Sequence, residues 1–314
     1  MMTCLLSVSI YLLFSHLMVP NIKKHVLHRM LKPRTVLKPT NVSNYVMAFA
    51  QNYAPVQVAH FVDTFIHCHQ ASTRLVLFVS DKAAFQSRWN HHHVYFESVA
   101  GSGNPIFTRF YTYAAFVRAN DTGAVTMLDA RDLFFQGDVF EPSFAPGVHF
   151  FAENYTMDYV PNWNVPWVRD CVLGGNEMAQ RMVQARMPIV NGGSVLCSNR
   201  TFALLFLEAM EKAIEANCND QGYMDILAWT RPFGVNFTHI HLMQVDSWIG
   251  HGLQWPEATD VGLQQDSAGR IYSSSGVLFA ALHQVDRNPR LASLWGLRFR
   301  LSNKSRGVLR PFRF

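Results

Sequence analysis

Residues 126–140 read TMLDARDLFFQGDVF, and the expected fold is organised around this stretch. An apolar start leads to Asp129, Ala-Arg and Asp132, and a second apolar patch follows before Gln-Gly-Asp. An apolar run bounded by polar turn residues is typical of a buried strand. Carboxylates at the end of such a strand are costly unless something pairs with them, and ligands of open α/β sheets bind at that end. We therefore expect a divalent cation with a phosphorylated substrate at Asp129 and Asp132, whereas Asp138 fits a turn.

The flanking sequence alternates between strand and helix patterns. Strands are predicted at 45–50, 74–79, 93–96 and 148–152, and helices at 56–69, 83–89, 108–117, 201–216 and 223–229. Residues 162–167 are expected to form an aromatic loop, residues 238–245 are strand-like, and 277–284 form a last apolar run. This β-α-β-α-β order predicts an α/β fold, with a Rossmann-like, mostly parallel sheet flanked by helices. No linker interrupts the middle of the chain, so we expect a single catalytic domain.

Composition supports a globular protein and argues against disorder. The chain has 314 residues, of which 49% are hydrophobic and 16% are charged, which is enough apolar material for a large core. The net charge of +5 arises largely near the two ends. Basic ends around a nearly neutral middle are more typical of solvated or membrane-adjacent segments than of a nucleic-acid surface, so no nucleic-acid partner is expected.

The first residues have the character of a targeting segment. Residues 1–19 are mostly apolar and suggest a signal or signal-anchor; the alternatives are a buried helix or a mis-assigned start. A basic, proline-containing stem is expected at 20–41, and the catalytic domain with a basic tail at 42–314. The basic cluster follows the apolar segment, which by the positive-inside rule opposes a lumenal domain. Six N-x-S/T sequons favour the secretory pathway, and we expect a Golgi or ER membrane protein with a lumenal domain.

The cysteines fit that compartment without defining a bonding pattern. If Cys4 belongs to the leader, Cys68, Cys171, Cys197 and Cys218 remain, and they allow three pairings. The chain has no C-x-x-C spacing, so a structural zinc site is not expected.

Four short motifs occur in a distinctive order: Asp129-Ala-Arg-Asp132, Asn191-Gly192-Gly193, Asp220-Gln221 and a late His283. This order resembles the GT-A-fold nucleotide-sugar glycosyltransferases, and most of all retaining enzymes such as glycogenin. The resemblance spans about residues 42–289 and rests on motif order. It implies a GT-A-like fold and transfer of a sugar from a nucleotide-sugar donor, expected to be UDP-linked, to a hydroxyl of a glycan or glycoprotein. The N-terminal segment would attach such an enzyme to the membrane.

The resemblance also implies a metal site. Asp129, Asp132 and His283 match the metal ligands of the family, and carboxylates with an imidazole suit Mn²⁺ better than Mg²⁺. The acidic motif is one residue longer than Asp-x-Asp, which leaves open which carboxylate binds metal. Arg131 is either a diphosphate contact or a local ion-pair partner of Asp132.

The remaining carried-over residues would bind the donor and act on it. The nucleotide base would lie at the end of the first strand and in the turn after it, at Phe49, Ala50, Asn52 and Tyr53. Arg109 would be the basic helix residue that reaches the donor. Asn191, Gly192 and Gly193 would line the donor sugar, since glycine permits close backbone approach.

Asp220 and Gln221 match the pair at the catalytic centre, although Asn219 or Asp220 could instead simply cap the next helix. Glu153 is a second candidate carboxylate; as a general base it would allow inversion, whereas retention is the first expectation.

Two other classes of protein compete with this interpretation. A catalytically inactive, carbohydrate-binding relative would keep the fold and the aromatic residues Trp163 and Trp167 but not turn over. A metal-dependent hydrolase normally needs a denser cluster of His and Asp. The run 91–93 is three histidines, but consecutive residues of an extended chain face alternate sides, so a surface or strand-edge position is expected.

Overall fold

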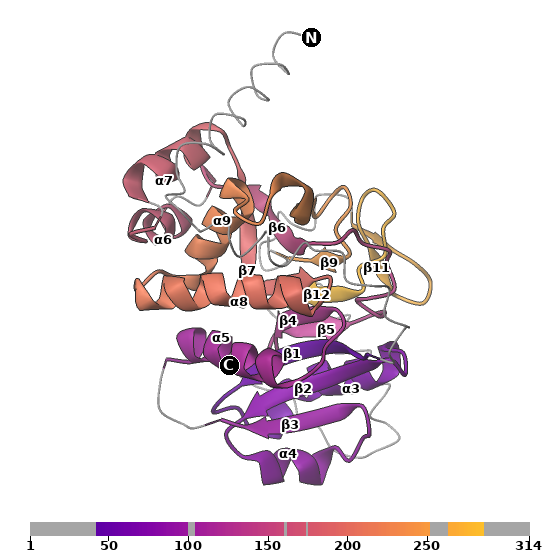
Figure 1. The fold of residues 1–314 in the computed structure, drawn as a ribbon. Coiled ribbons are helices and arrows are strands. Elements are labelled where there is room, and N and C mark those ends of the chain that lie inside the picture. Colours follow the sequence, from indigo (N-terminus) through magenta and orange to yellow (C-terminus); the bar gives the residue numbers. More distant parts are fainter. Residues whose placement is uncertain (1–41, 100–103, 160–161, 174, 252–262, 286–314) are drawn as a thin grey trace, which may run out of the picture.

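The computed structural model describes residues 42–99, 104–159, 162–173, 175–251 and 263–285 (Figure 1). The predicted signal segment at 1–19, the stem at 20–41 and the basic tail after 285 lie outside these residues. None of the described helices is long and apolar enough to cross a membrane.

A seven-stranded sheet forms the centre of the protein, in the order β3-β2-β1-β4-β7-β6-β8. Its strands are β1 (Asn44–Ala50), β2 (Thr73–Val79), β3 (Val94–Ser98), β4 (Val125–Asp129), β6 (Val148–Thr156), β7 (Pro188–Cys197) and β8 (Thr238–Leu242). β7 is antiparallel to both of its neighbours, and the other neighbouring strands are parallel. The predicted α/β fold with a mostly parallel sheet is therefore confirmed.

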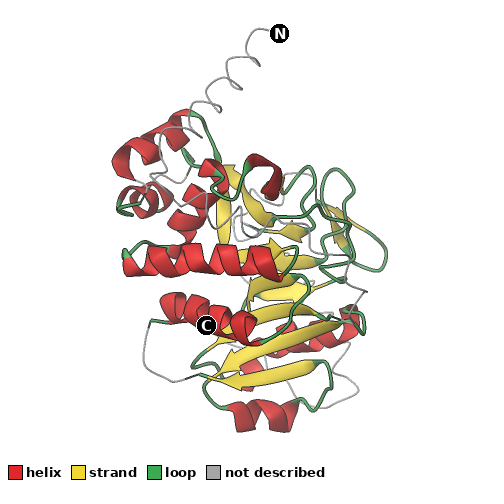
Figure 2. Ribbon diagram, in the orientation of Figure 1, coloured by secondary structure: helices red, strands yellow, loops and turns green. Residues whose placement is uncertain are grey.

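Helices cover both faces of the sheet (Figure 2). They are α3 (Ala59–Cys68), α4 (Lys82–Arg88), α5 (Pro105–Ala119), α6 (Asn164–Arg169), α7 (Gly175–Gln184), α8 (Arg200–Glu215) and α9 (Asp220–Thr230), with short 3-10 turns at Pro55–Val58 and Val235–Phe237. Successive side chains of a strand point to opposite faces. In β1, Val46 and Ala48 accordingly join the core under α3 and α4, while Met47 joins the core under α5, α8 and α9.

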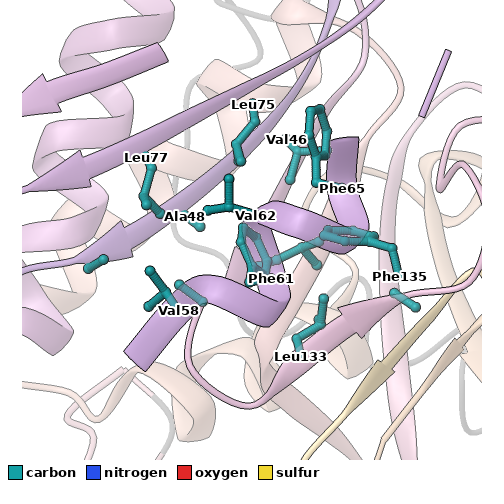
Figure 3. Close-up of a cluster of buried hydrophobic side chains, with 14 of the residues drawn as sticks. Val46, Ala48, Val58, Phe61, Val62, Phe65, Leu75, Leu77, Leu133 and Phe135 are labelled. Atoms are coloured by element: carbon teal, nitrogen blue, oxygen red, sulfur yellow. The ribbon is translucent and has the colours of Figure 1, made fainter. Parts of the chain in front are cut away.

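The first of these cores also fixes the path of the chain after the central strand (Figure 3). Strand β5 (Leu133–Phe135) contributes two buried side chains to it, and the rings of Phe61 and Phe135 lie 5.1 Å apart between centroids. β5 belongs to a second, three-stranded sheet in the order β5-β12-β9, with β12 (Ala281–His283) and β9 (Ile249–Gly250). A separate ribbon pairs β10 (Gln264–Gln265) with β11 (Ile271–Tyr272).

The stretch 126–140 is thus two strands in two sheets, not one buried strand. β4 ends at Asp129 and β5 begins at Leu133, so the two residues between the acidic side chains form a turn. Asp138 does lie outside the strands, but it is buried and accepts hydrogen bonds from the backbone N–H groups of Gln70 (3.1 Å) and Phe140 (2.9 Å). It anchors the approach to β2 as well as its own turn.

Three local predictions were wrong in their boundaries. The aromatic loop at 162–167 is partly helical, because α6 begins at Asn164 and includes Trp167. β6 continues to Thr156, so Glu153 lies within a strand and not at its end. The strand-like stretch at 238–245 stops at Leu242, where the backbone enters a turn.

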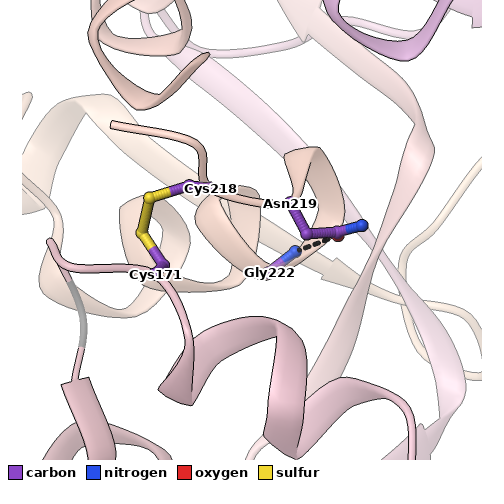
Figure 4. Close-up of a disulfide and its surroundings, with 4 residues drawn as sticks. All are labelled: Cys171, Cys218, Asn219 and Gly222. Carbon is purple, nitrogen blue, oxygen red and sulfur yellow. Dashed lines mark hydrogen bonds between the residues drawn. A yellow bond between two sulfur atoms is a disulfide. The ribbon is translucent and has the colours of Figure 1, made fainter. Parts of the chain in front are cut away.

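One disulfide joins the α6–α7 connection to the start of α9. Cys171 and Cys218 are bonded to each other (Figure 4), whereas the sulfur of Cys68 lies 3.5 Å from the Phe135 carbonyl and Cys197 is buried. Among the pairings that the sequence left open, the structure thus forms Cys171–Cys218. Because Cys218 directly precedes Asn219 and Asp220, the bond holds the beginning of α9 against α6.

Candidate metal centre

Three potential metal ligands converge where the two sheets meet. Asp129 is the last residue of β4, and Asp132 immediately precedes β5. His283 ends β12, which pairs antiparallel with β5 so that His283 lies opposite Leu133. This pairing places a residue from the far end of the described chain beside the acidic turn.

The distances within this group match a site for one cation. His283 Nε2 lies 3.5 Å from Asp129 Oδ2 and 3.2 Å from Asp132 Oδ1, and one ligand atom from each residue lies within 4.8 Å of the other two. The Nε2 atom is buried and faces both carboxylates without a hydrogen bond of good geometry. The turn between Asp129 and Asp132 brings both carboxylates to the same side, so the longer spacing is compatible with a shared ligand.

The two carboxylates of this group favour a positive charge beside them. Burial alone would lower the pKa of His283, but the adjacent carboxylates of Asp132 and Asp129 raise it to about 10. Burial raises the pKa of Asp129, and Arg109 and His283 outweigh this effect and hold it well below its usual range. Two oxygen ligands and one imidazole nitrogen are a donor set that suits Mn²⁺ and related divalent ions.

Arg109 ties this group to the rest of the sheet. From α5 its guanidinium donates to Asp129 Oδ1 at 2.7 Å and to the Gly192 carbonyl at 3.0 Å, and it also pairs with Asp220. Burial opposes the charge of Arg109, yet Asp220 and Asp129 raise its pKa above the usual range. Its two terminal nitrogens are engaged by the protein itself, and contact with a nucleotide-sugar stays a prediction.

The segment Asn191-Gly192-Gly193 lies in an irregular part of β7. Val195 pairs with Phe150 and Val190 with Ala152, so β7 has more residues than β6 between these points and bulges.

Side chains satisfy the backbone of the bulge. The Val190 N–H donates to Asp225 Oδ1 (2.7 Å), the Gly193 N–H to Asn191 Oδ1 (2.7 Å), and the Gly192 N–H to Gln221 Oε1 (3.3 Å). The predicted Glu153 accepts from the Asn191 amide at 2.6 Å, which makes it a support of the bulge in this structure.

Gly193 approaches the metal ligands closely. A β-carbon there would lie 2.6 Å from Asp129 Oδ2 and 2.6 Å from His283 Cε1. Real β-carbons do not approach neighbours to this distance, so only glycine fits without displacing the two ligands.

At the start of α9 the capping and pairing roles are separate. Asn219 caps the helix by accepting a hydrogen bond from the Gly222 N–H at 3.1 Å (Figure 4). Asp220 is the first residue of the helix; its buried carboxylate accepts a hydrogen bond from the Gln221 N–H at 2.8 Å and pairs with Arg109. Gln221 reaches both the bulge in β7 and Asn164 of α6, to whose side-chain oxygen it donates at 3.3 Å. The alternative in which Asp220 itself is the cap is therefore wrong.

The residues predicted to hold the nucleotide base are distributed over the end of β1 and its turn. Phe49 pairs in register with Asp129, and its ring lies edge-on to Tyr113 at 6.4 Å. Ala50 is fully buried, and Asn52 adopts a left-handed backbone with φ of 63° and donates its N–H to Ser80.

Two polar side chains of this edge border the metal ligands. Burial raises the pKa of Tyr53. The charge of Arg131 lowers this pKa and the charges of Asp129 and Asp132 raise it, because Tyr53 lies near the acidic turn. Arg131 is half-exposed and lies 3.6 Å from Asp132, so both of its predicted roles remain compatible with the geometry.

The sequence did not indicate His251 and Ser194, which lie behind His283. His251 follows β9, and its Nδ1 lies 3.0 Å from His283 Nδ1. Its Nε2 lies 2.6 Å from Ser194 Oγ in β7. A lone histidine after a two-residue strand carries no periodic signal, and only the tertiary pairing of β9 with β12 reveals its position.

Comparison with known proteins adds no assignment. No protein-family model matches the chain, and the search of curated proteins finds no match. The chemistry of the site is therefore argued from its residues.

Proposed function

We propose that this protein is a metal-dependent glycosyltransferase with a GT-A-like fold. It would move a sugar from a nucleotide-sugar donor, UDP-linked, to a hydroxyl group of a glycan or glycoprotein. The observation that carries this proposal is the convergence of Asp129, Asp132 and His283 at the carboxyl end of β4, within 4.8 Å of one another. That sheet edge is where α/β folds bind phosphorylated ligands, and Gly193 of β7, the antiparallel strand of the central sheet, lies against two of the ligands.

The donor set fits the implied cation. Asp129, Asp132 and His283 would hold Mn²⁺ or Mg²⁺, which neutralises the charge that develops on a leaving diphosphate. The half-exposed guanidinium of Arg131, beside Asp132, is suited to donate hydrogen bonds to the same phosphate oxygens.

The donor sugar would lie against the bulge of β7 and the start of α9. Arg109 holds the Asp220 carboxylate and the Gly192 carbonyl on one side of this space, and the side-chain oxygen of Gln221 accepts a hydrogen bond from the N–H of the same glycine. Asp220 and Gln221 would orient the sugar and stabilise its developing positive charge. Because Glu153 is engaged by Asn191, we favour retention of configuration over inversion.

The proposed location is the lumen of the Golgi or ER, with the N-terminal segment in the membrane. Disulfides such as Cys171–Cys218 form and persist in oxidising compartments, which supports a lumenal domain.

Nucleotide-sugar binding followed by thermal shift, with and without Mn²⁺, tests the function. We expect a donor-specific rise in melting temperature that requires the ion. Asp129→Ala and Asp132→Ala should each abolish the rise and the metal-dependent transfer. The control is Asp121→Ala, which removes an exposed carboxylate that precedes the first residue of β4. It should change neither the rise in melting temperature nor the transfer. Activity with UDP-sugars and Mn²⁺ that survives in both of the first two variants would rule out the proposed centre.

The second candidate is an inactive carbohydrate-binding protein, and one observation favours it. Trp163 is 63% exposed beside α6, as a sugar-stacking side chain would be. Its neighbour Trp167 instead packs its backbone against Gly222. Binding of oligosaccharides without any donor- and metal-dependent stabilisation would favour this candidate over the enzyme.

A further inference from the structure

A chain of three buried polar side chains leads from the metal centre into the central sheet. His283, His251 and Ser194 are 2%, 0% and 1% exposed. They come from β12, from the residue after β9, and from β7. The parallel pairing of β9 with β12 matches Ala281 to Ile249 and Leu282 to Gly250, so the two histidines that follow lie side by side.

The contacts of this chain are short enough for hydrogen bonds. The two histidines face each other through their Nδ1 atoms at 3.0 Å, and Nε2 of His251 lies 2.6 Å from Ser194 Oγ. A neutral imidazole donates through one ring nitrogen and accepts through the other. The ring nitrogen that carries the hydrogen in one histidine therefore determines which nitrogen carries it in the next.

We propose that His251 is a positioning residue that fixes the metal-binding form of His283. This inference rests on the proposed metal site. A metal ligand must offer the Nε2 lone pair of His283 to the ion, so the hydrogen of that ring lies on Nδ1 and is donated to Nδ1 of His251. The hydrogen of His251 then lies on Nε2 and is donated to Ser194 Oγ. The His283 ring is held in one tautomer and one orientation by a partner of its own.

The anchor at the far end of the chain makes this arrangement rigid. Ser194 pairs with Leu128 of β4, one residue before Asp129, and follows the bulge residue Gly193 in β7. The histidine ligand and the carboxylate ligand are therefore positioned by the same pair of strands. A buried polar chain is costly unless its groups are paired, and these contacts pair both nitrogens of His251 and Nδ1 of His283, which leaves Nε2 of His283 facing the carboxylates.

Two substitutions of His251 in the full-length protein separate this role from simple packing. His251→Gln keeps an acceptor for His283 and a donor for Ser194, whereas His251→Phe keeps a ring of similar size without either. Mn²⁺ affinity is measured by titration with electron paramagnetic resonance, and the nitrogen coupling of bound Mn²⁺ reports on the His283 ligand. We expect the Phe variant to bind Mn²⁺ about 10- to 100-fold more weakly with an altered nitrogen coupling, and the Gln variant to stay within a few-fold of wild type.

Wild-type affinity and nitrogen coupling in His251→Phe would overturn the inference, as would equal losses in the Phe and Gln variants. If His251→Phe does not fold, Ser194→Ala decides, because it removes only the terminal hydroxyl; it should weaken Mn²⁺ binding several-fold, and unchanged binding would count against the role. Wild-type protein that binds Mn²⁺ no better than Asp132→Ala, with no nitrogen coupling, would instead refute the proposed metal site and, with it, this inference.

Discussion

Substituting Gly193 by alanine tests the metal centre with the smallest possible addition. The new methyl group would lie 2.6 Å from Asp129 Oδ2, 2.6 Å from His283 Cε1 and 2.9 Å from Asn191 Oδ1. Gly193 lies in β7 without a left-handed backbone, so alanine can adopt its conformation. The effect must therefore come from these contacts.

The size of the effect follows from the distances. Ordinary van der Waals contact begins at 3.4 Å, so the Asp129 and His283 atoms must each retreat by about 0.8 Å. Metal–ligand distances tolerate only about 0.2 Å, so two of the three ligands leave their places. We expect Mn²⁺ affinity to fall at least about 10-fold, the order of loss seen when ligand orientation is disturbed. Overpacking of the buried strand should also lower the free energy of unfolding by about 1–3 kcal/mol.

The assay is a Mn²⁺ titration followed by electron paramagnetic resonance, with a urea unfolding curve on the same samples. Gly137→Ala is the matched control, since its β-carbon would meet only Ala280 at 3.8 and 3.9 Å. The control should keep wild-type affinity. A Gly193→Ala protein that binds Mn²⁺ as tightly as the control would show that these three residues do not share a cation.

Three further predictions concern stability. Arg109→Met leaves the carboxylates of Asp129 and Asp220 without their partner and should lower the free energy of unfolding by about 3 kcal/mol in urea, whereas a change below about 1 kcal/mol would show that the ion pairs are not stabilising. Burial lowers the pKa of His149 to about 4, so between about pH 6.5 and pH 4 the unfolded chain binds a proton that the folded protein does not. The free energy of unfolding should therefore fall over that window, by at most about 3 kcal/mol. His149→Gln should flatten this dependence of stability on pH, and equal slopes in the two proteins would contradict the reasoning. Replacing both Cys171 and Cys218 by serine opens a loop with a sequence separation of 47 and should cost about 4 kcal/mol in the same assay; an unchanged urea midpoint would mean that the bond does not constrain the unfolded chain.

Local patterns in the sequence predicted the first half of the sheet well. The strand expected at 45–50 is β1 (Asn44–Ala50), and the one expected at 74–79 is β2 (Thr73–Val79). Both are short apolar runs, each followed by a helical repeat, so strand type and order follow from local composition alone. The placement of Asp129 at a strand end was predicted for the same reason.

Features that depend on long-range pairing were not predictable in this way. An apolar pattern indicates which residues of β7 are buried, but it does not say that the strand inserts antiparallel between β4 and β6. The position of His251 beside His283 depends on a two-residue strand whose partner lies more than thirty positions away. Glu153 was assigned to a strand end because polar residues follow Ala152. In the structure β6 continues past Glu153, whose carboxylate accepts a hydrogen bond from Asn191 in the bulge of β7.

The structural roles of Asn191, Gly192 and Gly193 bear on how much their motif says about function. The Asn191 side chain satisfies the Gly193 N–H of a bulged strand, and the Gly192 carbonyl receives Arg109. The lack of a side chain at Gly193 leaves room for Asp129 and His283. Each position therefore has a structural reason that requires no donor sugar. What favours the proposed transferase function is the space beside Gly193, because a bulge that served packing alone would not need its glycine against a histidine and a carboxylate that face a common point.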